Sequence, residues 1–372
     1  MSSSVFGAIV KFRFIRIITL NGRHVALYPE HYHNGPNMKV NMISETVWSV
    51  KGHGVHSAYL EMTAGLSQLR GVDVKVNTFR KADITHIQTI GPYALLQLLF
   101  ARNKKVISVH VIPDSFVGSI IGSRWWYQLA VIYLRFLYNR GDRLLAVSQE
   151  VKDQLINQLH IKKPIEVFFN TIGSRQFATT PELRQQARRE LGLTAQDFAV
   201  IGNGQVQPRK RFDIFLKLAQ TNPGLRFFWA GGIPFKHLGA DYNAMQKLIA
   251  SAPPNLTVTG VIGRDQVKRY FNAGDAFLLP SEQENHPVAM LEAAAAGLPV
   301  IVRDLHAYDS AFGDKVLRGT DQTFIDIILK LKNDREFRRL AISNAADIAN
   351  RFDNLTGSKQ LLEIYKATLA AS

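Results

Sequence analysis

The feature that most constrains the fold of this chain is a regular alternation of short β-branched or apolar runs with longer segments of helical period. Strands that alternate with helices in this way form parallel sheets with crossover helices. In the first half, the strand-like runs are 40–43, 72–77, 84–88, 106–110, 144–147 and 165–169. In the second half, they are 199–202, 227–230, 256–259, 276–279 and 300–302. The sequence therefore predicts an α/β chain with two similar lobes.

The length of the chain agrees with two lobes. A chain of 372 residues is longer than one hydrophobic core usually sustains. After Pro181 a polar and basic helix-like stretch leads to Phe198, where the alternation restarts. We expect a Rossmann-like domain over 38–180, a second one over 181–350, and a C-terminal helix over 351–372 that crosses back to the first domain.

Residues 1–37 are expected to form an extension ahead of the first domain. Their apolar run 5–20 is interrupted by basic residues and lacks the small-residue cleavage site of a signal peptide. A basic segment that lies at a membrane interface is one interpretation. An upstream extension without a role is the other, because a strand-like start recurs at 38–42.

The charge balance points to an anionic partner. The chain has 45 Lys and Arg against 30 Asp and Glu, a formal net charge of +15, and this surplus attracts nucleic acid, anionic lipid or phosphorylated substrates. No zinc-finger spacing, RNA-binding aromatic motif or basic heptad accompanies the charge, so the sequence argues against a nucleic-acid partner and favours a membrane surface. The absence of cysteine excludes disulfide frameworks, thiolate zinc sites and cysteine nucleophiles, and agrees with a cytoplasmic protein.

A basic loop in the second lobe is a candidate phosphate site. Ligands of open parallel sheets bind beyond the carboxyl ends of the strands, so the loops there are where chemistry is expected. The loop 202–211 carries Arg209, Lys210 and Arg211 between a strand and the helix expected from Phe212. Glycine backbone, the helix dipole and these cations would converge on one diphosphate. A solvated basic turn is the alternative interpretation.

Glycine-rich turns follow other strand-like runs. They contain Gly52 and Gly54 in the first lobe and Gly231 and Gly232 in the second. Backbone N–H groups in such turns can approach an anion closely. Each turn is also consistent with a tight connection between a strand and a helix, because neither carries a full dinucleotide fingerprint or a Walker lysine.

The most informative segment is 279–300. A polar loop follows the strand-like run, and Pro287 opens a helix of small residues that Gly297 closes. Glu284 lies in the loop and Glu292 in the helix. Two carboxylates so placed could accept hydrogen bonds from hydroxyl-rich groups, one on a sugar and the other on a ribose, without a metal. The acid and base of a glycosidase are the rival interpretation.

This pair of carboxylates resembles the Glu-x7-Glu signature of glycosyltransferase family 4. The similarity extends to 280–281 ahead of the pair and to 297–300 behind it, and the order of elements over 38–372 is similar to that of the family. The resemblance implies a GT-B fold, in which two Rossmann-like domains face each other across a cleft, and a retaining transfer from a nucleotide sugar. The first domain would then be the acceptor side and the second the nucleotide-sugar side.

The resemblance also implies roles for single residues. Glu292 would bind the ribose hydroxyls, and Glu284 would hold the sugar with the backbone of the two residues that follow it. Lys210 and Arg209 would neutralise the diphosphate, and His110 would lie near the sugar hydroxyls. The catalytic residues that the resemblance implies are therefore His110, Glu284, Lys210 and Arg209. The donor-binding residues that it implies are Gly52, Gly54, Gly204, Gln205, Gly231, Gly232, Val261, Asn285, His286, Pro287, Val288 and Glu292.

The sequence departs from the family pattern at two places. Gln205 stands where the family usually has an arginine five residues before the lysine, and Arg209 is the candidate substitute. Asn285-His286-Pro287 stands where many relatives carry Gly-Phe-Gly. For His110, a buried histidine at the end of a strand is the alternative to an active-site role.

A narrower resemblance is carried by 38–45, 51–59 and 204–210. These segments resemble Gram-positive enzymes that glycosylate diacylglycerol or monoglucosyldiacylglycerol to make membrane glycolipids and lipoteichoic acid anchors. The resemblance implies transfer of glucose or galactose from a UDP-sugar to such a lipid. The alternatives are a transferase for a polyprenyl-linked polysaccharide intermediate and a non-catalytic protein that binds anionic lipid or nucleotide.

The segment 120–143 independently suits a membrane surface. Aromatic and basic side chains run through an apolar helix-like stretch, and the membrane or acceptor candidates in it are Arg124, Trp125, Trp126 and Arg135. The stretch between its cations is too short to span a bilayer, so we expect a peripheral protein at the inner face of the cell membrane. A core helix with snorkelling arginines is the alternative. No Asp-x-Asp element occurs, so we expect neither a metal nor a cofactor.

Overall fold

The computed structural model describes residues 16–20, 23–27, 37–47, 54–116, 127–233 and 242–371. The chain divides into two compact units, Met1–Asn37 and Met38–Ser372. In the first unit, β1 (Arg16–Leu20) and β2 (Arg23–Leu27) pair as antiparallel strands, which the sequence analysis did not predict. The second unit contains both lobes and all of the candidate site residues that the structure describes.

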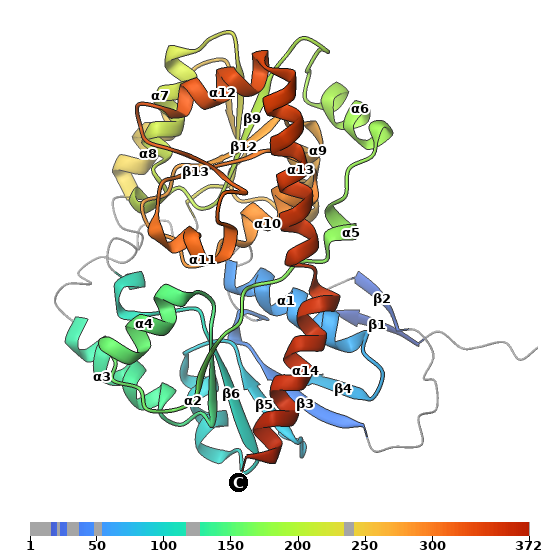
Figure 1. Ribbon diagram of the computed structural model, residues 1–372, viewed down its shortest axis with the longest axis vertical. Helices are drawn as coiled ribbons and strands as arrows, with labels where there is room; N and C mark the ends of the chain where they lie inside the picture. The colour runs from blue at the N-terminus through green and yellow to red at the C-terminus, as the bar shows by residue number, and fades with distance from the viewer. Residues whose placement is uncertain are drawn as a thin grey trace, which may run out of the picture. The chain divides into compact units, whose positions relative to one another are not determined.

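The first lobe is built on a parallel sheet of six strands in the order β4-β3-β5-β6-β7-β8 (Figure 1). The strands are β3 (Met38–Ile43), β4 (Val72–Val76), β5 (Ile84–Ile87), β6 (Lys104–Val109), β7 (Arg143–Ala146) and β8 (Ile165–Val167). The helices described with them are α1 (Gly54–Ser67), α2 (Pro92–Phe100), α3 (Tyr127–Tyr138) and α4 (Gln149–Asn157). Each strand-like run predicted in this half is confirmed as a strand.

The second lobe repeats the plan with six parallel strands in the order β11-β10-β9-β12-β13-β14. The strands are β9 (Ala199–Asn203), β10 (Arg226–Ala230), β11 (Leu256–Val258), β12 (Ala276–Leu279), β13 (Val300–Arg303) and β14 (Leu317–Gly319). The longer helices are α6 (Pro181–Glu190), α7 (Phe212–Thr221), α8 (Tyr242–Ala250), α9 (Arg264–Ala273), α10 (Val288–Ala295), α12 (Phe324–Asn333) and α13 (Arg335–Arg351). Two such sheets confirm the predicted α/β class with two Rossmann-like lobes.

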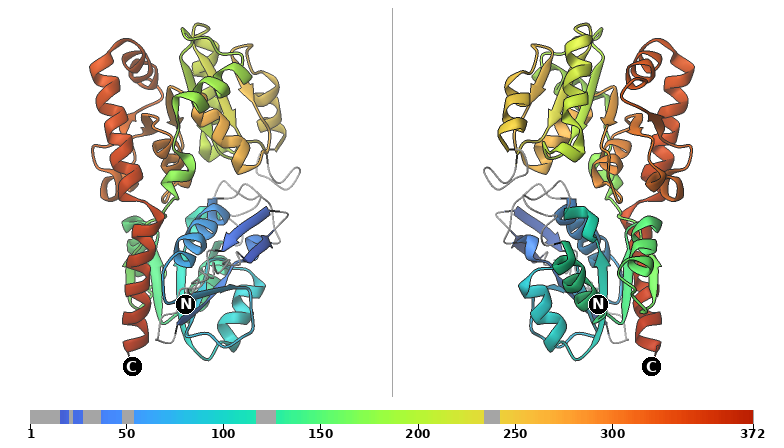
Figure 2. Two further views of the ribbon diagram at one scale, coloured as in Figure 1. Left: turned by 90° about the vertical axis from the view of Figure 1, so that its right-hand side faces the viewer. Right: turned by 90° about the vertical axis from the view of Figure 1, so that its left-hand side faces the viewer.

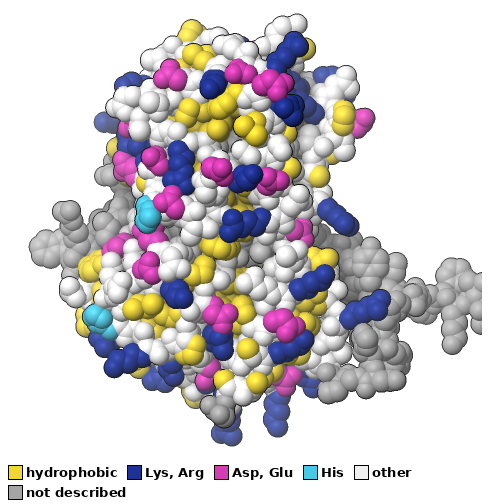
Figure 3. Space-filling model, viewed as in Figure 1, with side chains coloured by type: hydrophobic (Ala, Val, Ile, Leu, Met, Phe, Trp, Pro, Cys, Tyr) yellow, Lys and Arg dark blue, Asp and Glu magenta, His cyan; other side chains and the backbone are white. Residues whose placement is uncertain are grey.

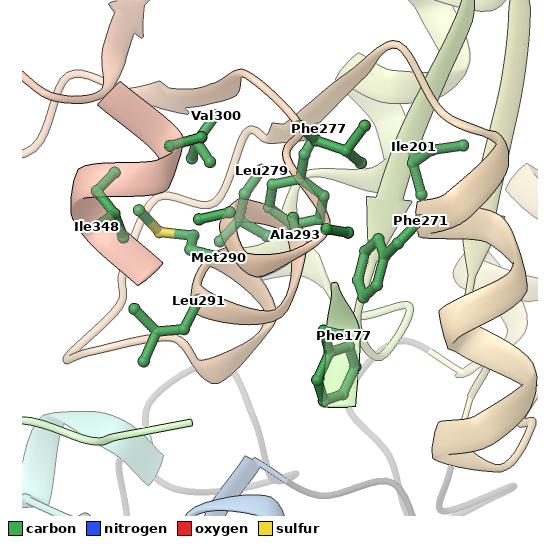
Figure 4. Packing of buried hydrophobic residues seen from close by; sticks show 14 of the residues in the cluster. Phe177, Ile201, Phe271, Phe277, Leu279, Met290, Leu291, Ala293, Val300 and Ile348 are labelled. Carbon is green, nitrogen blue, oxygen red and sulfur yellow. The ribbon is translucent and has the colours of Figure 1, made fainter. Parts of the chain in front are cut away.

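One hydrophobic core of the second lobe lies between its sheet and α10, as Figure 4 shows. Phe277 and Leu279 of β12 are fully buried, and so are Met290 and Leu291 of α10. Burying a side chain of this size stabilises the fold by about 1.5–3 kcal/mol. The small residue Ala293 lets α10 approach the sheet closely. The helix that carries Glu292 is therefore held firmly against the strand that precedes Glu284.

The chain crosses between the lobes twice, and the two crossings are hydrogen-bonded to each other. Ile172 N donates to Phe352 O at 2.9 Å, and Asn354 N donates to Ile172 O at 2.8 Å. After the second crossing, α14 (Asn354–Ala370) packs against α1 (Figures 1 and 2). A Cβ atom on Gly65 of α1 would lie 2.2 Å from Ser358 Oγ, so a glycine is needed for this close contact.

Candidate active site

The strand order of the second lobe reverses between β9 and β12. Open α/β sheets bind ligands at such a reversal, beyond the carboxyl ends of the strands. The loop after β9 carries Lys210 and the loop after β12 carries Glu284. Lys210 Nζ donates a hydrogen bond to Glu284 Oε1, and both side chains are largely buried. The topology thus brings together two residues that the sequence analysis assigned to one site.

Arg209 adds a second cation to this pair. Its Nη1 atom lies 4.0 Å from Glu284 Oε1 and donates a hydrogen bond of 3.2 Å to Gln283 O. The backbone joins the same two loops, because Glu282 N donates to Arg209 O at 2.9 Å. Two cations beside one carboxylate leave a local surplus of positive charge, which suits an anionic ligand such as a diphosphate.

The charges in this cluster shift the pKa values of both partners. Burial alone would raise the pKa of Glu284, but Lys210 and Arg209 outweigh burial and hold it below its ordinary value. Burial lowers the pKa of Lys210 below its ordinary value, although the attraction of Glu284 opposes this effect. Arg209 contributes to both shifts, because a neighbouring cation favours the loss of a proton from either group.

Gln205 occupies the position at which the family usually has an arginine, and it is not part of the cationic cluster. Gln207 Nε2 donates a hydrogen bond of 2.8 Å to Gln205 Oε1. Among the described residues, the second cation near Glu284 is therefore supplied by Arg209.

The glycine turns of the second lobe lie against one another at the ends of β9, β10 and β11. A Cβ atom on Gly231 would lie 1.9 Å from Gly204 O, and one on Gly232 would lie 2.9 Å from Val261 N. The φ angles of Gly204 and Gly231 are 152° and 153°, a region that favours glycine. Four of the predicted donor-binding residues therefore lie together at the edge of the sheet where ligands are expected.

Glu292 is buried on α10 and pairs with a residue that the sequence analysis missed. Arg264 Nε, at the start of α9, donates a hydrogen bond of 2.6 Å to Glu292 Oε1. The other side of the guanidinium contacts the first lobe, where Nη1 lies 2.6 Å from Glu61 Oε1. Burial raises the pKa of Glu292 and Arg264 partly offsets the rise. The one sequence signal for Arg264 was its place just after β11, at the carboxyl edge of the sheet.

His110 follows β6 directly and belongs to a buried polar chain in the first lobe. Its Nε2 lies 3.0 Å from Gln88 Oε1. Gln88 Nε2 lies 3.0 Å from His86 Nε2, and His86 Nδ1 lies 2.6 Å from Tyr365 OH on α14. Burial lowers the pKa of His86 to about 3, so His86 is neutral at physiological pH and can accept a hydrogen bond from Gln88. The amide oxygen of Gln88 then accepts from His110 Nε2.

Two hydrogen bonds connect the first lobe to the loop that carries Glu284. Asn285 Nδ2 donates to His110 O at 3.2 Å, and Asn170 Nδ2 donates to His286 O at 2.7 Å. His110 is therefore brought next to the loop of the second lobe, as a site shared by both lobes requires. Pro287 and Val288, which complete the loop and begin α10, are buried.

The side chain of His286 packs away from this polar site. Its ring centroid lies 5.1 Å from those of Phe169 and Phe312 and 4.9 Å from that of Phe352. Neither ring nitrogen has a hydrogen-bond partner among the described residues. Burial, with a smaller effect of Arg351, lowers the pKa of His286 to about 3. The imidazole fills the place of an aromatic hydrophobic side chain.

The remaining candidates either have no contact that links them to this site or lie outside the described residues. Gly52, Arg124, Trp125 and Trp126 belong to the second group. Gly54 begins α1, and an added Cβ there would meet no atom of the described residues within 4 Å. Arg135 is exposed on α3. None of the described helices is both long enough and apolar enough to cross a membrane.

Family models match the two lobes separately. The model described as Glycosyltransferase Family 4 matches residues 47–176. The model described as Glycosyl transferases group 1 matches residues 184–347. The first match covers the strands β4 to β8, and the second covers the strands β9 to β14 with the Lys210, Glu284 and Glu292 segments.

Curated relatives match most of the chain. An alpha-galactosylglucosyldiacylglycerol synthase of Streptococcus pneumoniae is 30% identical over 276 residues, which cover 73% of this chain and 74% of that protein. A processive diacylglycerol alpha-glucosyltransferase of Acholeplasma laidlawii is 23% identical over 275 residues, which cover 73% of this chain and 80% of that protein.

Solved structures share the fold. Anabaena HepE in complex with UDP-glucose matches with a TM-score of 0.72 and 20% identity, over 89% of this chain and all of that chain. Sucrose-phosphate synthase from Thermosynechococcus elongatus matches with a TM-score of 0.74 and 14% identity, over 90% of this chain and all of that chain. These likenesses confirm the predicted GT-B fold. Together with the two family models and the pneumococcal relative, they show that this chain is a glycosyltransferase of family 4.

Proposed function

We propose that this glycosyltransferase transfers glucose or galactose from a UDP-sugar to diacylglycerol or monoglucosyldiacylglycerol, with retention of configuration at the anomeric carbon. The observation that carries the proposal is the cluster of Lys210, Arg209 and Glu284 at the strand reversal of the second lobe. The relatives from Streptococcus pneumoniae and Acholeplasma laidlawii, both named for diacylglycerol-type acceptors, support the acceptor. The UDP-glucose complex of Anabaena HepE supports the donor.

In this proposal the diphosphate binds beside Lys210 and Arg209. The two cations stabilise the negative charge that develops on the leaving UDP, and preorganised stabilisation of this kind commonly contributes more to catalysis than any other effect. When phosphate oxygens reach Lys210, Glu284 can exchange part of its ion pair for hydrogen bonds from sugar hydroxyls. Glu292 accepts hydrogen bonds from the ribose, as an ionised carboxylate can. His110, held through Gln88, faces the sugar from the first lobe.

We propose that the first lobe reaches the acceptor by docking on the inner face of the cell membrane. Leu129, Ile132 and Phe136 of α3 expose 66%, 64% and 46% of their surface, and their spacing places them on one face of the helix. Arg135 is exposed on the same helix, and the guanidinium of Arg140 lies 4.2 Å from the Phe136 ring centroid. Apolar and aromatic side chains bordered by arginines suit a bilayer interface with anionic lipids.

The first test measures transfer from radiolabelled UDP-glucose and UDP-galactose to diacylglycerol and monoglucosyldiacylglycerol in anionic micelles. Wild type is compared with Glu292→Ala, and we expect lipid-soluble label that falls at least tenfold in the variant, because a hydrogen bond to a charged group contributes about 1.5–3 kcal/mol. NMR of the product reads the anomeric configuration. Donor hydrolysis without a lipid product would mean that the enzyme uses an acceptor other than these two lipids. No turnover with any acceptor would favour a binding protein that is not an enzyme.

We also propose that the transfer needs no divalent metal. Arg209 and Lys210 can supply the positive charge that a metal ion would otherwise bring to the diphosphate. The same assay in EDTA is expected to keep its full rate. Activity that EDTA abolishes and manganese restores would contradict this proposal.

A further inference from the structure

Glu61 of α1 is a buried carboxylate at the point where the two crossings meet. Only 2% of its surface is exposed. Its Oε2 atom accepts hydrogen bonds from Gly173 N at 2.5 Å, on the first crossing, and from Asn354 Nδ2 at 3.0 Å, at the end of the second. Its Oε1 atom pairs with Arg264 at 2.6 Å. One carboxylate thus contacts both connections between the lobes and one cation of the second lobe.

Arg264 is held on three sides. Its Nε donates to Glu292, its Nη1 pairs with Glu61, and its guanidinium lies 4.7 Å from the ring centroid of Phe177 in α5 (Ser174–Phe177). Its Nη2 is buried and has no hydrogen-bond partner among the described residues. A buried N–H group without a partner costs about 1–3 kcal/mol, so a ligand oxygen that accepts a hydrogen bond from Nη2 would recover that cost.

The arrangement contains one more carboxylate than a structural pair needs. Glu61 and Arg264 would neutralise each other, and Glu292 adds a second buried negative charge. An extra buried charge without full compensation is costly. The second buried carboxylate is explained if Glu292 binds a ligand. Arg264 would then fix the position of Glu292 Oε1 and favour the ionised form of the carboxylate.

We propose that Arg264 is a positioning residue of the donor site, which orients Glu292 toward the nucleotide and connects it through Glu61 to the two crossings between the lobes. The proposal rests on the proposed function, in which Glu292 contacts the ribose. It goes further in giving Nη2 of Arg264 a ligand oxygen as its partner and in linking the occupancy of the donor site to the arrangement of the two lobes. Nucleotide binding then changes the Arg264 contacts and, with them, the hydrogen bonds at the crossings.

The test measures UDP affinity by isothermal titration calorimetry across a set of variants. Glu292→Gln shows whether Glu292 contacts the nucleotide at all. Arg264→Leu is expected to weaken UDP binding roughly tenfold or more, the effect of losing a hydrogen bond to a charged group. Arg264→Lys, which keeps the charge, is expected to recover part of the affinity. Arg269→Leu, on the same helix in a partly exposed pair with Glu190, is the matched control and should bind UDP like wild type.

A double variant separates positioning from folding. Arg264→Leu leaves Glu61 and Glu292 buried without their shared cation, so its melting temperature is expected to fall. Glu61→Gln combined with Arg264→Leu removes one of the two unpaired charges and should recover part of the melting temperature but none of the UDP affinity. Recovery of both would show that Arg264 acts only on stability and would overturn the proposal.

The pH dependence of UDP binding gives an independent readout. Arg264 opposes the rise in the pKa of Glu292 that burial causes. Without Arg264, Glu292 should take up its proton at a higher pH, so the loss of UDP affinity on acidification should begin at a higher pH in Arg264→Leu than in wild type. UDP affinity within twofold of wild type in Arg264→Leu, at every pH, would overturn the proposal. An unchanged affinity in Glu292→Gln would instead refute the donor role of Glu292.

The link to the crossings is tested with Glu61→Gln, which keeps the Arg264 contact with Glu292. Small-angle X-ray scattering with and without UDP reports the change in radius of gyration on binding. We expect Glu61→Gln to bind UDP within about threefold of wild type, since its direct contact is with Arg264 and not with the ligand. The change in radius of gyration should differ from that of wild type. An identical change would show that Glu61 does not link the donor site to the crossings between the lobes.

Discussion

At the scale of single residues, His286 shows how a polar side chain can act as a hydrophobic one. The ring lies among Phe169, Phe312 and Phe352, and both of its nitrogens lack a hydrogen-bond partner among the described residues. The aromatic contacts are retained only while the imidazole is neutral, because a buried imidazolium without a partner is strongly unfavourable. The loop that carries Glu284 therefore contains a buried group whose packing is sensitive to acid.

This packing predicts an acid-dependent loss of stability. The pKa of His286 falls from 6.5 to about 3 on folding, so between these values the unfolded chain binds a proton that the folded chain does not. Stability contributed by the neutral ring is present above pH 6.5 and is lost as the pH falls toward 3. The cost at pH 5 is about 2 kcal/mol. His286→Phe is expected to remove this part of the pH dependence, measured by urea unfolding at pH 5 and pH 8.

Two controls make the measurement specific. His86, with a pKa of about 3, remains in the His286→Phe variant and should keep a residual acid sensitivity. His306, whose side chain is 96% exposed, is not part of the aromatic cluster, and His306→Gln should keep the loss of stability that His286 causes. An unfolding free energy that varies with pH in the same way in wild type and in His286→Phe would contradict the prediction.

At the scale of elements, the periodicity of the sequence was sufficient to predict most of the strands and helices of the fold. The eleven predicted runs became β3 to β13, since β-branched runs between helical segments have few other ways to bury their apolar faces. The loop, helix and closing glycine around Glu284 and Glu292 also followed the expected pattern. β14 (Leu317–Gly319) was missed because three residues that include an arginine carry no apolar run.

The parts of the site that were not predicted depend on contacts between elements far apart in the sequence. Glu61 lies within a helix and Arg264 opens another, and neither position carries a motif. Their pairing exists because the crossings place α1 beside the start of α9. The link from His110 through Gln88 and His86 to Tyr365 likewise requires α14 to return to the first lobe. Contacts of this kind, between elements far apart in the chain, cannot be predicted from a single sequence.

At the scale of the whole molecule, the proposed docking on a membrane gives different roles to the net charge and to the apolar face of α3. On the face shown in Figure 3, Lys and Arg side chains lie among Asp and Glu and are not gathered into one large patch. A net charge of +15 attracts an anionic bilayer over a distance of about one Debye length, roughly 8 Å at physiological ionic strength. It does not by itself select which surface of the protein meets the lipid.

The apolar face of α3 is expected to make that selection. Leu129→Asp combined with Ile132→Asp should weaken binding to vesicles that contain phosphatidylglycerol by roughly 100-fold, because burying each side chain contributes about 1.5–3 kcal/mol. Leu340→Asp, at a residue of α13 that is 59% exposed, is the matched control and should bind like wild type. Co-sedimentation measures the binding, and titration with UDP should give unchanged donor affinity in all variants. Equal vesicle binding by the α3 variant and wild type would mean that α3 does not dock on lipid, and that the charge acts through another surface.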